Sequence, residues 1–224
     1  MFECVILAGG FGTRLKSISG EIPKPMVIIS GVPFLYRVMK EVELQGCSKI
    51  ILSLHYRADF IIECISRDKP VNCQVKFVVE EEPLGTGGAL KRSAQFVSSE
   101  KFIVLNGDTY QEIDLIDFYN TEGAGLIMSA VEVPDVFRYG ELCIDNNQRV
   151  LKMLPKGQRR AGLINSGTYL IRVEDILSFP MEIFSFETDF IPEFEGNIRA
   201  YLRTRDFVDI GVPEDYYAAC KRFS

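Results

Sequence analysis

A glycine-rich segment near the N-terminus combines a flexible backbone with two cationic side chains. It runs from Leu7 to Leu15 as L-A-G-G-F-G-T-R-L and is followed by Pro23-Lys24-Pro25. Its glycines let backbone N–H groups come close to phosphate oxygens. Arg14 offers a planar fork to a phosphate, and Lys24 offers a compact point charge on a backbone restrained by the flanking prolines. The segment therefore predicts a polyphosphate site.

Two common phosphate-binding motifs do not fit this segment. A P-loop needs lysine directly after its second glycine, whereas Gly12 is followed by Thr13 and Arg14. A dinucleotide fingerprint needs a third glycine, and none follows Gly10 and Gly12 at the required offset. A nicotinamide-dependent oxidoreductase is therefore disfavoured.

Two aspartates are associated with apolar runs that we expect to be strands. Asp108 follows residues 101–106, and Asp209 lies in Phe207-Val208-Asp209-Ile210. Ligands of open α/β sheets gather beyond the carboxyl ends of the strands, and Mg²⁺ prefers carboxylate oxygens. Because both carboxylates are expected beside the polyphosphate site, we predict Mg²⁺ as the cofactor. The only histidine, His55, is expected to have a structural role.

The first half of the chain alternates short apolar runs with amphipathic segments, a rhythm typical of a mainly parallel sheet flanked by helices. We expect strands at residues 3–8, 49–54, 74–79 and 101–106. We expect helices at residues 34–45, 58–65 and 86–96. The predicted fold class is α/β, with a Rossmann-like, mostly parallel mixed sheet.

The second half of the chain is richer in strand-like runs. We expect strands at residues 126–133, 141–144, 149–154, 163–171, 198–203 and 207–210, and a closing helix at residues 213–223. No repeat, linker or low-complexity tract separates the halves. We therefore predict a single domain over residues 1–224, in which the second half forms a lid over the first.

The composition disfavours several function classes. The formal net charge of −6 argues against nucleic-acid binding, which requires a basic face. No apolar stretch approaches the ~20 residues of a membrane span, so no membrane association is expected. The acidic Glu3 and the early Gly9-Gly10 do not fit a signal peptide. Six scattered cysteines without metal-ligand spacing favour a reduced, cytoplasmic protein.

The strings L-A-G-G-x-G-T-R-L and P-K-P together resemble the signature of the sugar-1-phosphate nucleotidylyltransferases, and the likeness runs over essentially the whole chain. That family joins a nucleoside triphosphate to a sugar 1-phosphate and releases pyrophosphate. The resemblance implies a nucleotide-diphospho-sugar transferase fold, with a nucleotide-binding half at about residues 1–123 and a sugar-binding half at 124–224. It assigns the β- and γ-phosphates to Arg14 and Lys24, and the metal to Asp108 and Asp209.

The resemblance also implies which residues bind the nucleotide. They come from the glycine-rich segment and from a second loop, E-E-P-L-G-T: Leu7, Ala8, Gly9, Gly10, Gly12, Thr13, Glu80, Pro83, Gly85 and Thr86. Many thymidylyl enzymes carry glutamine near the position of Glu80. A carboxylate there can accept from both N1–H and N2–H₂ of guanine, and GTP is therefore the favoured nucleotide. Glu81 and Glu82 could instead form a solvent-exposed acidic turn with no role in binding the nucleotide.

The sugar 1-phosphate is assigned to the second half of the chain. The string Ile164-Asn165-Ser166-Gly167-Thr168-Tyr169 resembles the family's sugar-binding strand, where Asn165 can bond hydroxyls and Gly167 lets a sugar approach the backbone. Gly140, Lys156 and Glu187 complete the predicted set. Lys156 lacks the glutamate that precedes this lysine in the family's E-K-P motif, and a helix start is an equal alternative for Glu187.

Further strings resemble those of the bacterial D-glycero-α-D-manno-heptose 1-phosphate guanylyltransferases: His55-Tyr56, E-E-P-L-G-T-G-G and Phe184-Ser185-Phe186-Glu187. This likeness implies transfer of GMP to a heptose 1-phosphate, in a route to capsule or other surface polysaccharide. The alternatives are a mannose-1-phosphate guanylyltransferase, a glucose-1-phosphate thymidylyl-, uridylyl- or cytidylyltransferase, and an inactive regulatory subunit that binds a nucleotide sugar. The sequence does not indicate the oligomeric state, and a homo-oligomer is one of the possibilities.

Overall fold

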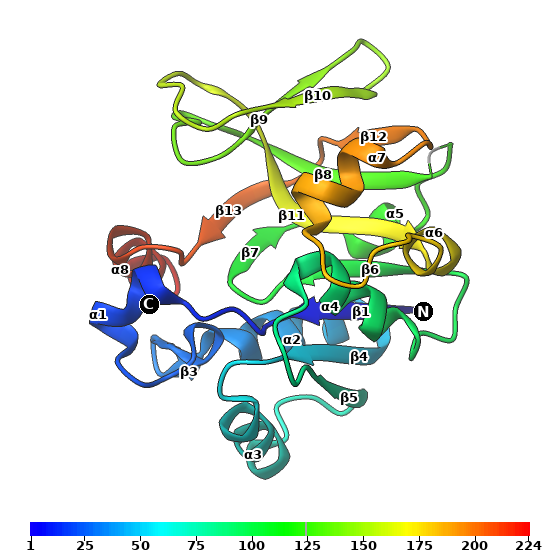
Figure 1. The fold of residues 1–224 in the computed structure, drawn as a ribbon. Coiled ribbons are helices and arrows are strands. Elements are labelled where there is room, and N and C mark those ends of the chain that lie inside the picture. The colour runs from blue at the N-terminus through cyan, green and yellow to red at the C-terminus, as the bar shows by residue number, and fades with distance from the viewer. Residues whose placement is uncertain (124) are drawn as a thin grey trace.

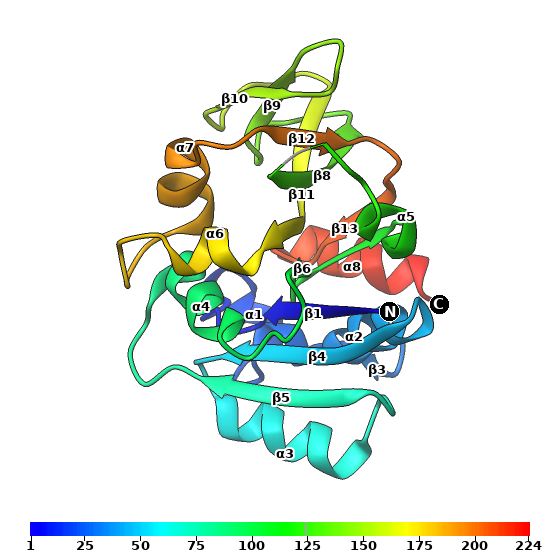
Figure 2. The ribbon, with the colours of Figure 1, turned by 90° about the vertical axis from the view of Figure 1, so that its right-hand side faces the viewer.

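A nine-stranded sheet runs through both halves of the chain (Figure 1). The computed structural model describes residues 1–123 and 125–224, so residue 124, at the predicted boundary between the halves, lies outside the described residues. Four neighbouring strands are parallel, in the order β5 (Gln74–Val79), β4 (Cys47–Leu54), β1 (Phe2–Leu7) and β6 (Lys101–Asn106). Figure 2 shows β1, β4 and β5 side by side.

Helices cover both faces of this parallel part because its strands are apolar on both sides. In β1, Cys4 and Ile6 pack with α2 (Phe34–Leu44) and α3 (Ala58–Asp68), whereas Val5 packs with α4 (Gly85–Ala94) on the opposite face. All three β1 side chains are fully buried, and burial of an aliphatic side chain contributes about 1.5–3 kcal/mol. The pattern fixes β1 at the centre of the core.

The second half adds mostly antiparallel strands. β11 (Gly162–Arg172) pairs antiparallel with β6, β8 (Leu126–Val133) pairs antiparallel with β11, and β12 (Ile198–Tyr201) runs parallel to β8. The hairpin of β9 (Glu141–Ile144) and β10 (Val150–Leu154) forms the top of the view in Figure 1. The predicted α/β class with a mostly parallel mixed sheet is confirmed.

A small separate ladder connects the end of the chain to its middle. β7 (Thr109–Glu112) pairs antiparallel with β13 (Arg205–Asp209), and α8 (Pro213–Arg222) follows. In this ladder Asp209 lies opposite Thr109, and the N–H of Ile210 donates to the carbonyl of Asp108 over 3.1 Å. The pairing therefore brings Asp209 beside Asp108, about a hundred residues earlier in the chain.

The predicted strands and long helices are present, with ends shifted by up to three residues. The structure also contains short elements that the sequence analysis did not predict: the 3-10 helices Thr13–Leu15 and Lys24–Met26, α1 (Lys16–Ser19), β2 (Ile28–Ile29), β3 (Val32–Pro33), β7, α5 (Leu115–Tyr119), α6 (Val173–Leu177), the π-helix Phe186–Phe190 and α7 (Ile191–Glu193). These are too short to show a hydrophobic period. Within the two described ranges, no helix has both the length and the apolar character needed to cross a bilayer.

Candidate active site

A cavity of about 520 Å³ opens where the carboxyl ends of the central strands meet. Leu7 of β1, Ser53 of β4 and Asn106 of β6 line it. The strand order turns back between β1 and β6, and such switch points are where open α/β sheets bind ligands. The remaining lining residues are Ala8, Gly9, Gly10, Phe11, Gly12, Thr13, Arg14, Lys24, Pro25, His55, Glu80, Pro83, Gly85, Thr86, Ala89, Asp108, Tyr169, Ser185, Phe186, Glu187 and Gly211.

The glycine-rich segment forms one wall of this cavity. The N–H of Tyr56 donates to the carbonyl of Gly9 over 3.3 Å, which fastens the segment to the loop after β4. Gly12 has φ +60°, and a Cβ on it would lie 2.7 Å from Cβ of Lys24. Only glycine therefore lets this segment pass so close to Lys24, and the closeness explains how the two predicted phosphate-binding strings meet. Arg14, on the following 3-10 helix, is exposed and faces the same cavity.

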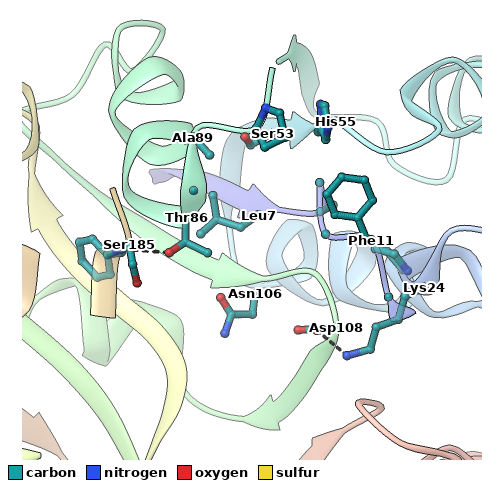
Figure 3. Close-up of a pocket in the computed structure, with 18 of the residues that line it drawn as sticks. Leu7, Phe11, Lys24, Ser53, His55, Thr86, Ala89, Asn106, Asp108 and Ser185 are labelled. Atoms are coloured by element: carbon teal, nitrogen blue, oxygen red, sulfur yellow. Dashed lines mark hydrogen bonds and ion pairs between the residues drawn. The ribbon is translucent and has the colours of Figure 1, made fainter. Parts of the chain in front are cut away.

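Three charged groups converge at one end of the cavity; Lys24 and Asp108 line it, and Asp209 lies behind them without being a lining residue. The buried ammonium of Lys24 lies 2.5 Å from Oδ2 of Asp108 (Figure 3). It also lies 3.8 Å from Oδ1 of Asp209. Burial, and then the negative charge of Asp108, raise the pKa of Asp209 above its ordinary range, while Lys24 and Arg138 act in the opposite direction. The predicted metal ligands and Lys24 are thus brought together.

Two residues near Asp209 were not predicted. The guanidinium of Arg138 lies 3.5 Å from Oδ2 of Asp209 and 2.6 Å from Oδ2 of Asp215. The hydroxyl of Tyr139 lies 3.5 Å from Oδ2 of Asp209. Both residues come from the loop between β8 and β9. In the sequence they could have been noticed as a basic and an aromatic residue directly before Gly140, which was itself predicted to bind the sugar phosphate.

The carboxylates suit a magnesium ion. Among residues 1–123 and 125–224 no three acidic, cysteine or histidine side chains are grouped as a metal site; Asp108 and Asp209 are two carboxylates that both approach Lys24. Mg²⁺ is commonly held by one or two carboxylates together with substrate phosphates and water. A site with two carboxylates beside a predicted polyphosphate wall therefore fits Mg²⁺.

The opposite end of the cavity is organised by Glu80. This buried carboxylate accepts from the hydroxyl of Ser53 over 3.3 Å and from the N–H of Leu84 over 3.1 Å. Nδ1 of His55 lies 3.0 Å from the carbonyl of Glu80, and its ring meets Phe11 edge-on. His55 thus contacts both loops that line this end of the cavity, an arrangement compatible with its expected structural role.

Two of the five predicted sugar-binding residues, Asn165 and Glu187, form a hydrogen-bonded group with Tyr169 on one side of the cavity. The amide of Asn165 donates to the hydroxyl of Tyr169 over 2.6 Å and to Oε1 of Glu187 over 3.0 Å, and Tyr169 donates to the same Oε1 over 2.9 Å. Burial, and then the negative charge of Glu187, raise the pKa of Tyr169, so it remains a donor. Tyr169 and Glu187 line the cavity, and Asn165 orients both.

The other predicted sugar-binding residues lie elsewhere. Gly167 has φ +83°, and the space beside its Cα is taken by the side chain of Asn106, so its influence on the cavity is indirect. Gly140 and Lys156 are not among the lining residues, and Lys156 is exposed after β10. Asn106, Ser53 and Tyr169 line the cavity without having been predicted. The rule that strand ends collect ligands would have found the first two.

Fold and cavity together are those of a nucleotidyl transferase. The family model described as "Nucleotidyl transferase" matches residues 3–223, and the chain belongs to this family. Among named relatives, it is 39% identical over 218 residues to the D-glycero-alpha-D-manno-heptose 1-phosphate guanylyltransferase of Campylobacter jejuni, covering 96% of this chain and 97% of that protein. It is 33% identical to the enzyme of the same name from Aneurinibacillus thermoaerophilus, covering 98% and 97%.

A solved structure is also similar to this chain over its full length. HddC from Yersinia pseudotuberculosis superimposes with a TM-score of 0.94 at 52% identity, covering 100% of both chains. A second structure of that protein, complexed with GMP-PN, gives a TM-score of 0.93.

Proposed function

We propose that this enzyme transfers GMP from GTP to D-glycero-α-D-manno-heptose 1-phosphate, giving GDP-heptose and pyrophosphate. The reaction type is supported by one observation: the side chains of Lys24, Asp108 and Asp209 lie close together beside the glycine-rich wall. The choice of substrates is supported by two relatives with that printed activity, which match over nearly their whole length.

The reaction is a single in-line displacement in which a sugar phosphate oxygen attacks the α-phosphorus of GTP and pyrophosphate leaves. Arg14 and Lys24 bind the β- and γ-phosphates and stabilise the charge that develops on the leaving group. Asp108 and Asp209 hold Mg²⁺, which supplies further positive charge for the reacting phosphates when bound. No enzyme nucleophile is required, because both reacting groups are brought by the substrates.

The guanine and the sugar bind at different parts of the cavity. Glu80, held by Ser53 and Leu84, has lone pairs left to accept from the N–H groups of guanine. Glu187, held by Asn165 and Tyr169, accepts from sugar hydroxyls on the other side. We place the reaction in the cytoplasm, where the six free thiols of this chain stay reduced.

A substrate grid tests this proposal. Pyrophosphate release is measured for GTP, ATP, CTP, UTP and dTTP, each with heptose, mannose and glucose 1-phosphates, at a fixed Mg²⁺ concentration. We expect kcat/KM for GTP with the heptose 1-phosphate to exceed every other pair by about ten-fold or more, the effect of roughly one well-made base contact. A higher kcat/KM for mannose 1-phosphate or for another nucleotide would show that the substrates are assigned wrongly.

A further inference from the structure

The loop that starts α4 is joined to a distant segment, residues 184–187. The N–H groups of Gly87 and Gly88 donate to the carbonyl of Phe184 over 2.9 and 3.3 Å, and the N–H of Phe184 donates to the carbonyl of Leu84 over 3.0 Å. The hydroxyl of Thr86 accepts from the N–H of Phe186 over 2.9 Å (Figure 3). Four hydrogen bonds thus connect regions about a hundred residues apart.

The glycines of G-T-G-G allow the α4 loop and residues 184–187 to pack this closely. Gly85 has φ +73°, and a Cβ on it would lie 2.5 Å from the carbonyl oxygen of Phe184. A Cβ on Gly87 would collide with the ring of Phe184, and one on Gly88 would collide with the carbonyl of Glu182. The Phe184 carbonyl accepts from the N–H groups of Gly87 and Gly88, so these two of the first four N–H groups of α4 are satisfied by the segment 184–187.

The hydroxyl of Thr86 has a particular place in the junction. Phe186 is the first residue of the π-helix Phe186–Phe190, and the first N–H groups of a helix lack partners within it. Thr86 provides the missing acceptor from another helix, as an N-cap side chain does from within one. The next residue is Glu187, whose carboxylate faces the cavity and accepts from Asn165 and Tyr169.

We propose that Thr86 is a positioning residue for the sugar 1-phosphate, although it lies on the wall assigned to the nucleotide. By fixing the N–H of Phe186, it sets the place of Glu187 and so couples the α4 loop to the sugar side of the cavity. The inference rests on the proposed function, because it takes Glu187 as the acceptor for sugar hydroxyls.

The kinetic test compares Thr86→Val, which keeps the shape and removes the acceptor, with Thr86→Ser, which keeps the hydroxyl. We expect Thr86→Val to raise KM for the sugar 1-phosphate by about three- to ten-fold, the scale of one lost hydrogen bond. KM for GTP rises less than KM for the sugar 1-phosphate, and Thr86→Ser keeps both values near those of the wild type. Thr121→Val, a matched substitution at a hydroxyl that bonds Asp117 on α5, leaves both values unchanged.

A second readout does not depend on turnover. In Thr86→Val, the amide of Phe186 exchanges with solvent deuterium faster than in wild-type protein, whereas amides of the central strands keep their protection. Thr86→Ala serves in the same measurement should the valine disturb folding. Unchanged exchange at Phe186 in the folded variant would overturn the inference.

Glu187→Gln separates this inference from the proposed function. If Glu187→Gln raises KM for the sugar and Thr86→Val does not, the inference fails while the proposed function stands. An equal rise in KM for GTP and for the sugar in Thr86→Val also overturns it, because Thr86 would then be only a nucleotide contact. If Glu187→Gln leaves the sugar KM unchanged, the proposed sugar site is wrong, and the inference falls with it.

Discussion

The ammonium of Lys24 lies 2.5 Å from Oδ2 of Asp108, and the two residues are separated by 84 positions in the chain. The 3-10 helix Lys24–Met26 supplies the cation, and the turn between β6 and β7 supplies the acid. Asp209 lies 3.8 Å from the same ammonium, so two carboxyl groups meet at Lys24. We expect a divalent cation to bind the two carboxylates, which would leave the Lys24 ammonium free to bind an anionic phosphate.

Removing the Lys24 cation is expected to reduce turnover. Lys24→Met should lower kcat by about 10²–10³, the usual cost of removing one group that stabilises a developing anion. Steady-state pyrophosphate release with GTP and the heptose 1-phosphate measures this change. Lys16→Met, at an exposed lysine in the same N-terminal region, is the matched control and should keep wild-type turnover. A folded Lys24→Met enzyme within ten-fold of wild type would exclude the proposed role.

The two aspartates are expected to bind the metal together. Asp108→Asn and Asp209→Asn should each weaken Mn²⁺ binding by about ten-fold or more, because each removes one of two charged protein ligands. Electron paramagnetic resonance of Mn²⁺, titrated into protein without nucleotide, measures the affinity. Asp206→Asn, three residues earlier on β13 and paired with Arg222, should bind Mn²⁺ as wild type does. Wild-type affinity in either active-site variant would refute the assignment.

The Glu80 carboxylate is expected to contribute to the choice of base. Glu80→Gln replaces one acceptor oxygen by a donor and should reduce the preference for GTP over dTTP by about five- to a hundred-fold in kcat/KM. Its melting temperature should also fall, because the amide meets the N–H of Leu84 or the hydroxyl of Ser53 less well. Glu81→Gln, on the exposed side of the same turn, is the control. An unchanged ratio would leave Glu80 with a structural role only.

A contact between the two halves is expected to make stability depend on pH. The Tyr201 hydroxyl donates to Oδ2 of Asp117 over 2.7 Å, and this bond, followed by Arg203, lowers the pKa of Asp117 below its ordinary value of 3.8. A lowered carboxyl pKa stabilises the fold above that ordinary value, and the contribution is lost as pH falls through the folded-state pKa. Tyr201→Phe should therefore melt about 2–4 °C lower at pH 7, with a smaller difference below pH 3.8. A melting difference that stays constant across this range would contradict the account.

Local patterns in the sequence predicted the strands, helices and loops whose residue types follow a clear hydrophobic or glycine-rich pattern. The parallel strands are continuous apolar runs, and the glycine-rich segment and Pro23-Lys24-Pro25 flank the first helical turns. Asp108 and Asp209 could be predicted as candidate metal ligands because each stands at a strand end. Their closeness depends on the β7–β13 ladder, whose four- and five-residue strands show no clear period of their own.

Contacts between distant segments could not be predicted in this way. Gly85 and Thr86 were predicted only as nucleotide-binding residues, whereas in the structure Gly85 packs against the carbonyl of Phe184 and Thr86 accepts from the N–H of Phe186. Arg138 reaches Asp209 from a loop about seventy residues away. Such partners are chosen by packing of the folded chain, which one local stretch of sequence does not encode.

Product analysis by ³¹P nuclear magnetic resonance tests the central claim most directly. With GTP, D-glycero-α-D-manno-heptose 1-phosphate and Mg²⁺, wild-type enzyme should form a sugar nucleotide and pyrophosphate in equal amounts. The Asp108→Asn/Asp209→Asn double variant, and wild type with the metal chelated, should form neither. Release of GDP and phosphate by wild type, or full product formation by the folded double variant, would contradict the account.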